Sequence, residues 1–165
     1  KQTISQPYIV ARMTEHLLSD TSKRGKVLNQ VLEIGSGCGY QSAILSHFAN
    51  DVFAVERIKP LVVKSRENLS DLKIRNVIVK HADGFNGWEE DLKFDGIICA
   101  AAPRQYPEEL LDLLEIGGKL VIPVGLEGKQ QLYVINKKSE TENEEMVHEE
   151  VAFVPMLPGV SNGDV

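Results

Sequence analysis

Three glycines at alternate positions form the most chemically informative part of this chain. Gly35, Gly37 and Gly39 follow a short apolar run of strand type that carries the acidic residue Glu33. Because glycine lets backbone approach a ligand more closely than any side chain allows, this spacing predicts a ligand-binding loop. A dinucleotide-binding loop has its third glycine at the sixth position, where this chain has Tyr40. A nicotinamide or flavin site is therefore disfavoured. The plainer interpretation is an ordinary tight turn, which usually needs a single glycine.

Acidic and small residues follow at the ends of the next three predicted strands. Glu56 ends the second, Asp83 stands directly before Gly84 after the third, and alanines at 100–102 end the fourth. Because open parallel sheets bind ligands at the carboxyl ends of their strands, we expect these residues beside the glycine loop. There Glu56 can accept hydrogen bonds from both hydroxyls of a ribose, and Asp83 one from an adenine amino group. The plainer interpretations are a solvated strand end, an Asp-Gly turn and close packing of small residues.

Composition and spacing argue against several other functions. A net charge of −6 disfavours nucleic acid as a partner, and the apolar runs are strand-sized, too short to span a membrane. No Cys-x-x-Cys occurs and no histidine pair has metal-ligand spacing, so no metal site is predicted, and no G-x-S-x-G supplies a hydrolase nucleophile. The histidines are His16, His47, His81 and His148. Two cysteines, Cys38 and Cys99, form no disulfide framework, which favours the cytoplasm.

Alternating strand and helix patterns predict one α/β domain over 1–165, with a mostly parallel, doubly wound sheet and an antiparallel strand pair near the C-terminal end. We expect a substrate-side loop at 1–7, a cofactor-binding core at 8–130, the strand pair within 131–157 and a tail at 158–165. The acidic stretch 139–150 is predicted to be a solvated loop and hairpin face. Helices are predicted at 7–20, 40–48, 60–72 and 107–114, and strands at 27–34, 52–56, 77–81, 94–101, 119–124, 131–135 and 151–154.

Two motifs resemble those of a known family. The glycine loop with its preceding acid resembles the first motif of S-adenosylmethionine-dependent methyltransferases. The opening stretch 2–15, which contains Thr3-Ile4-Ser5-Gln6-Pro7, resembles more specifically the protein-L-isoaspartate O-methyltransferases. That family carries a helical segment before this element, so we expect the present chain to lack it. Further matches, which extend the resemblance from Gln2 to about Pro158, lie at 31–41, 55–57, 83–84, 87–88, 94–95, 100–101, 117–125 and 151–155.

The resemblance implies a Rossmann-like class I methyltransferase fold, S-adenosyl-L-methionine as the cofactor, and no metal. It implies methyl transfer to the free carboxylate of L-isoaspartyl residues in damaged proteins and peptides, and we expect a monomer. It makes Ser5 the catalytic residue. The implied substrate-binding residues are Thr3, Ile4, Pro123, Val124 and Val154. The expected cofactor-binding residues are Gly35, Ser36, Gly37, Cys38, Gly39, Glu56, Arg57, Asp83, Gly84 and Ala101.

The implied reaction needs no general base, because a carboxylate with an ordinary pKa near 4 is already ionised at neutral pH. It needs in-line positioning, which supplies roughly 7–11 kcal/mol. Ser5 would then orient the acceptor through a hydrogen bond, although either Ser5 or Gln6 also lies where the cap of a helix beginning at Pro7 belongs. The alternatives are a methyltransferase with a small-molecule acceptor, a non-catalytic cofactor-binding module and, least favoured, a nicotinamide oxidoreductase.

Overall fold

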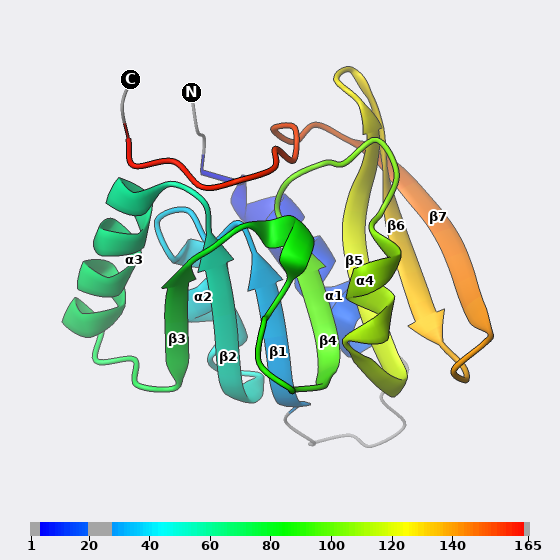
Figure 1. Ribbon diagram of the computed structural model, residues 1–165, viewed down its shortest axis with the longest axis horizontal. Coiled ribbons are helices and arrows are strands. Elements are labelled where there is room, and N and C mark those ends of the chain that lie inside the picture. Colours follow the sequence, from blue (N-terminus) through cyan, green and yellow to red (C-terminus); the bar gives the residue numbers. More distant parts are fainter. Residues whose placement is uncertain (1–3, 20–27, 164–165) are drawn as a thin grey trace.

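The computed structural model describes residues 4–19 and 28–163. These residues form a seven-stranded sheet in the order β3-β2-β1-β4-β5-β6-β7 (Figure 1). The strands are β1 (Leu28–Ile34), β2 (Ala49–Glu56), β3 (Val77–His81), β4 (Phe94–Cys99), β5 (Leu114–Leu126), β6 (Lys129–Lys137) and β7 (Asn143–Val151). The helices are α1 (Pro7–Leu18), α2 (Tyr40–Leu45), α3 (Lys59–Asp71), the short 3₁₀ helix η1 (Gly84–Asn86) and α4 (Glu108–Asp112).

The sheet is parallel from β3 to β5 and antiparallel from β5 to β7. β1 pairs in parallel with both β2 and β4, which lie on opposite sides of it. β2 pairs with β3 and β4 with β5 in the same sense, whereas β6 runs antiparallel to both β5 and β7. The chain therefore changes its direction of winding beside β1, the position where open α/β sheets bind ligands. The predicted fold class is confirmed.

Apolar side chains that alternate along the strands pack against helices on both faces of the sheet. Val31 packs in a buried cluster with residues of α1 and α2, whereas the next residue, Leu32, packs with Leu110 of α4 on the other face. Figure 1 shows η1 and α4 in front of the sheet, with α1 and α2 behind it. α1 lies very close to β4, because a Cβ atom at Gly96 would stand 2.5 Å from Cδ1 of Leu17. This packing fixes the helix whose first turn borders the site described below.

The acidic stretch 139–150 is mostly exposed to solvent, as its charge predicts, but it is largely strand rather than loop. Most of it is β7, which runs Asn143–Val151 and forms the edge of the sheet, while 152–154 is not a strand. The prediction of a loop was wrong because an edge strand pairs on one side only and so needs little apolar surface. Charged residues there discourage further strand pairing. Two predicted helices are also shorter, since α2 ends at Leu45 and β5 already begins at Leu114.

The segment 152–163 crosses the carboxyl ends of the parallel strands. Figure 1 shows it passing over the sheet from β7 towards α3. The amide of Ala102 donates to the carbonyl oxygen of Val154 (2.8 Å), and the amide of Ser161 donates to that of Arg57 (2.7 Å). These backbone hydrogen bonds hold the segment over the strand ends, where it forms one wall of a cleft.

Candidate active site

A cleft lies at the carboxyl ends of β1, β2 and β4 and is open to solvent; the empty space within it and at its mouth is together about 890 Å³. Its walls come from the residues before α1, the glycine loop, the ends of β2 and β4, and the C-terminal segment. The lining residues are Ile4, Ser5, Val10, Glu33, Ile34, Gly35, Ser36, Gly37, Cys38, Tyr40, Gln41, Val55, Glu56, Arg57, Gly84, Ala100, Ala101, Val154, Pro155, Met156 and Leu157.

The glycine loop has the backbone conformation that its sequence predicts. Gly35, Gly37 and Gly39 have φ angles of 84°, 53° and 89°, values that L side chains rarely adopt. A Cβ atom at Gly37 would meet open space, so that residue presents bare backbone to the cleft. Gly39 does not line the cleft, because it begins α2 and packs against α3, where its Cβ atom would stand 3.3 Å from Ser65.

Glu56 connects the glycine loop to the end of β2. Its side chain is buried, and its two carboxylate oxygens accept hydrogen bonds from the amides of Gly37 (3.0 Å) and Ile58 (2.9 Å). Each oxygen keeps a second lone pair, so the carboxylate can still accept hydrogen bonds from a ligand in the cleft. Glu56 therefore holds the loop and faces the same space as the loop.

Glu33 is a site residue that the sequence analysis noticed without giving it a role. It lines the cleft yet is fully buried, and Ser42 of α2 donates a hydrogen bond to its Oε2. Oε1 has no hydrogen-bond partner among the described residues, and neither has the buried hydroxyl of Ser36. Burial raises the pKa of Glu33 to about 7; the Ser42 hydrogen bond opposes this rise and the charge of Glu56 adds to it. The sequence shows that Glu33 precedes the glycine loop, but it does not show that the side chain is buried.

Ser5 faces the cleft and does not cap the following helix. The N-cap of α1 is Gln6, and no side chain caps that end of the helix. The interpretation of Ser5 as a helix cap is therefore wrong. Ser5 is half-buried and lines the cleft beside the exposed side chain of Ile4. Thr3, the first residue of the motif Thr3-Ile4-Ser5-Gln6-Pro7, lies outside the described residues.

Asp83 lies beside the cleft but is not one of its lining residues. Its Oδ1 accepts a hydrogen bond from the amide of Phe85 (2.9 Å), which caps η1, and its Oδ2 accepts one from the amide of Gly159 in the C-terminal segment. The neighbouring Gly84 does line the cleft. Asp83 thus stabilises the wall, and its contact with a cofactor stays a prediction.

The predicted substrate-binding residues divide into two groups. Val154 lines the cleft from the C-terminal segment, although the strand predicted there is absent. Pro123 and Val124 lie within β5, paired with β6, and do not line the cleft. Their contact with a substrate also stays a prediction.

The fold and the cleft together define a class of protein. A mostly parallel sheet with two antiparallel strands at one edge, a G-x-G-x-G loop after β1 and an acid ending β2 make this a class I S-adenosylmethionine-dependent methyltransferase fold. The N-methyltransferase NodS from Bradyrhizobium japonicum shares this fold with a TM-score of 0.58. At 14% identity over 70% of this chain and 60% of that one, the likeness concerns the fold alone.

The chain belongs to the protein-L-isoaspartate(D-aspartate) O-methyltransferase family, whose model matches residues 1–161. Curated protein-L-isoaspartate O-methyltransferases from Methylobacillus flagellatus and Marinobacter nauticus are each 50% identical to it. The matches cover 97% and 96% of this chain, and 70% and 69% of those proteins. A solved protein-L-isoaspartate O-methyltransferase superposes with a TM-score of 0.81 at 27% identity, over 93% of this chain and 48% of that chain.

A second solved structure, named as a protein-L-isoaspartate O-methyltransferase from Plasmodium falciparum, is of a complex with S-adenosyl-L-homocysteine. Its TM-score is 0.76 at 31% identity, and the match covers 94% of this chain and 76% of that one.

Proposed function

We propose that this protein transfers a methyl group from S-adenosyl-L-methionine to the free carboxylate of L-isoaspartyl residues in damaged proteins and peptides. One observation carries the proposal: Ile4 and Ser5, which belong to the motif specific to the family, line the same cleft as the glycine loop. The cofactor side and the acceptor side of the reaction therefore face one space. Membership of the family supports the same reaction.

The residues of the cleft fit the cofactor. S-adenosyl-L-methionine, when bound, supplies a methyl group on a cationic sulfonium, and it also carries an ammonium group and two ribose hydroxyls. The unpartnered Oε1 of Glu33 suits a cationic group, and the remaining lone pairs of Glu56 suit the hydroxyls. The bare backbone at Gly37 leaves room for close approach. We assign the cofactor to these residues together with Gly35, Ser36, Cys38, Arg57, Gly84 and Ala101.

On the acceptor side, Ser5 is the orienting residue. The isoaspartyl carboxylate is already ionised at neutral pH, so it needs to be held in line with the methyl group rather than deprotonated. The hydroxyl of Ser5 can donate one hydrogen bond to a carboxylate oxygen and leave the other oxygen free to attack. Val154, Met156 and Leu157 provide apolar surface on the wall formed by the C-terminal segment, which helps to exclude water from the reacting groups.

A paired-peptide assay tests this function. The protein is incubated with methyl-labelled cofactor and an isoaspartyl peptide or its normal aspartyl twin, and the label released by mild base is counted. We expect a base-labile methyl ester on the isoaspartyl peptide alone. Binding of S-adenosyl-L-homocysteine by calorimetry without any ester would instead identify a cofactor-binding module. Label on small acceptors but on neither peptide would identify a different methyltransferase.

We also propose that the protein acts as a monomer in the cytoplasm. Cys38 and Cys99 are free thiols, as a reducing compartment favours. None of the helices in the described ranges is long and apolar enough to cross a membrane. The edge strand β7 carries several glutamates, which oppose edge-to-edge pairing of two copies. Light scattering should give the chain mass of 18.3 kDa, and twice that mass would contradict the monomer.

A further inference from the structure

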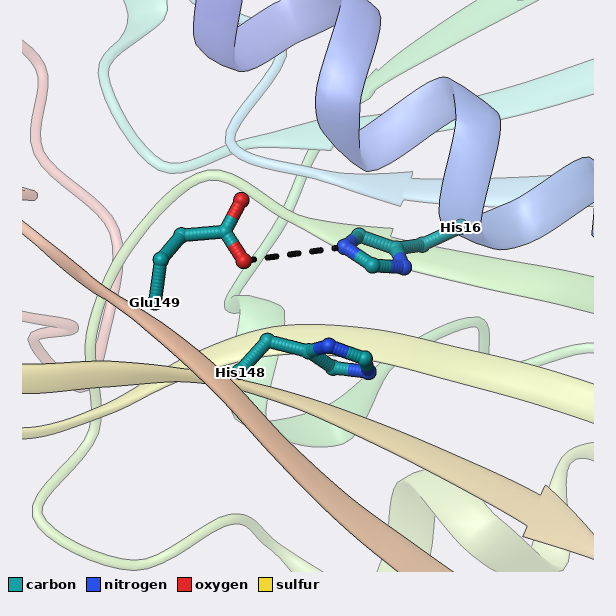
Figure 2. A group of neighbouring side chains, drawn as sticks. All are labelled: His16, His148 and Glu149. Carbon is teal, nitrogen blue, oxygen red and sulfur yellow. Dashed lines mark ion pairs between the residues drawn. The ribbon is translucent and has the colours of Figure 1, made fainter.

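Two histidines that are far apart in the sequence meet a glutamate on the face of the sheet covered by α1. His16 lies in α1, whereas His148 and Glu149 lie in β7 (Figure 2). The two imidazole rings have centroids 4.2 Å apart, and Nε2 of His16 lies 3.8 Å from Oε2 of Glu149. The cluster is separate from the cleft, since none of its members lines that cleft.

One ring nitrogen of each histidine in this cluster lacks a hydrogen-bond partner among the described residues. Nε2 of His16 and Nε2 of His148 are both buried, and neither finds a partner among the described residues. A buried polar atom left in this way costs free energy, so a native structure normally gives it a partner, a water molecule or an ion. One potential ligand atom from each of His16, His148 and Glu149 lies within 4.8 Å of the other two.

We propose that His16, His148 and Glu149 bind a divalent transition-metal ion, with Zn²⁺ as the best match. Two imidazoles and one carboxylate suit Zn²⁺, whereas Mg²⁺ and Ca²⁺ prefer sites built from oxygen alone. Zinc bonds of about 2.0–2.2 Å place tetrahedral ligand atoms about 3.4 Å apart. The 3.8 Å between Nε2 of His16 and Oε2 of Glu149 is near this value, and the three ligand atoms, which lie within 4.8 Å of one another, would move closer together on binding. A fourth position remains for water.

A neighbouring side chain orients the carboxylate ligand. Arg12 donates from Nε to Oε1 of Glu149 (3.0 Å), which leaves Oε2 directed towards His16. The positive charge of Arg12 also opposes a second cation, so we expect an affinity in the micromolar range.

A metal at this site would link the helix that borders the cleft to the edge of the sheet. Val10 of α1 and Ser5 just before it both line the cleft. Metal bonds between α1 and β7 would add a fixed connection at the last turn of that helix. Because the metal binds the folded chain with a geometry that the unfolded chain lacks, it should also raise thermal stability.

Zinc titration of protein without a polyhistidine tag tests the proposal. We expect about one Zn²⁺ per chain by calorimetry, and a rise in Tm of about 5–10 °C at a free concentration about 100 times the Kd. Co²⁺ should give visible ligand-field absorption, and Mg²⁺ should give no binding. His148→Ala and Glu149→Gln should each weaken Zn²⁺ binding about tenfold or more. His47→Ala, at an exposed histidine after α2, is the matched control and should bind like the wild type.

His148 and Glu149 lie in the edge strand β7, where side chains can be shortened with little effect on folding, and circular dichroism checks that both variants fold. Zn²⁺ binding by His16→Gln tests the ligand that α1 contributes to the cluster. The absence of stoichiometric Zn²⁺ binding would overturn the proposal. Wild-type affinity in His148→Ala, or an equal loss in His47→Ala, would overturn it as well.

Discussion

Replacing the buried Glu33 by glutamine should change how the stability of the cofactor-free protein depends on pH. Burial raises the pKa of Glu33 from an ordinary value of 4.5 to about 7 in the folded state. Between these two values the folded chain retains a proton that the unfolded chain has released. The free energy of unfolding of the wild type therefore contains a contribution that is fully present below pH 4.5 and is lost as the pH rises through 7.

The size of this effect follows from the difference between the two pKa values. Each unit is worth about 1.4 kcal/mol, so full ionisation of Glu33 costs the folded state about 3 kcal/mol. A glutamine fills the same volume, accepts the hydrogen bond from Ser42 and never ionises. The difference in unfolding free energy, variant minus wild type, should accordingly become more positive by about 3 kcal/mol between about pH 4 and pH 8.5.

Urea unfolding at a series of pH values measures this difference. Glu127→Gln, at an exposed glutamate in the β5–β6 turn, is the matched control and should leave the pH dependence as in the wild type. If the curves for the wild type and Glu33→Gln stay parallel to within about 0.5 kcal/mol, Glu33 does not change its protonation in this range and the reasoning fails. Saturating S-adenosyl-L-homocysteine should reduce the effect, because its ammonium group would stabilise the ionised carboxylate.

Three further outcomes test the site and its frame. Ser5→Ala should lower kcat about tenfold or more while cofactor affinity by calorimetry stays within about twofold; equal losses would assign Ser5 to cofactor binding. At pH 8 a thiol reagent should modify Cys38, which lines the cleft, but not Cys99, because burial raises the pKa of Cys99 to about 12. Rapid modification of both cysteines would contradict this. Gly87→Ala should lower the free energy of unfolding, measured in urea, by about 2–3 kcal/mol, because φ at this residue is 60° and the new Cβ atom would lie 2.4 Å from Leu113. A decrease below about 0.5 kcal/mol would refute the predicted clash.

Local patterns in the sequence predicted most of the fold. β3 was predicted at its observed bounds, and β1, β2 and β4 within a few residues, because buried parallel strands are short apolar runs bounded by turns. β7 was missed for the opposite reason. Many of its residues are charged, and it forms a strand by pairing with β6. The pairing extends from Lys137 opposite Asn143 to Gln130 opposite Val151. Such pairing depends on a long-range neighbour that no local window contains.

The same division separates the predicted from the missed parts of the site. The glycine loop and Ser5 were found because a motif of adjacent residues identifies them. The burial of Glu33 depends on the strands that flank β1 and on the helix that covers it. The cluster of His16 with His148 was invisible because spacing rules for metal ligands look along the sequence, whereas α1 and β7 meet only in the folded chain.

Glu56 and Asp83 show why position at a strand end predicts the neighbourhood of a residue but not its contacts. Both carboxylates accept two hydrogen bonds from backbone amides. One donor to Glu56 is Gly37, a residue of the cleft itself, so that carboxylate is held facing the ligand space. One donor to Asp83 is Gly159, whose segment crosses the strand ends and draws the carboxylate into the wall. The C-terminal segment thus decides which of two equivalent acids faces the ligand, and it reaches this position only after β6 and β7 have returned the chain to the sheet.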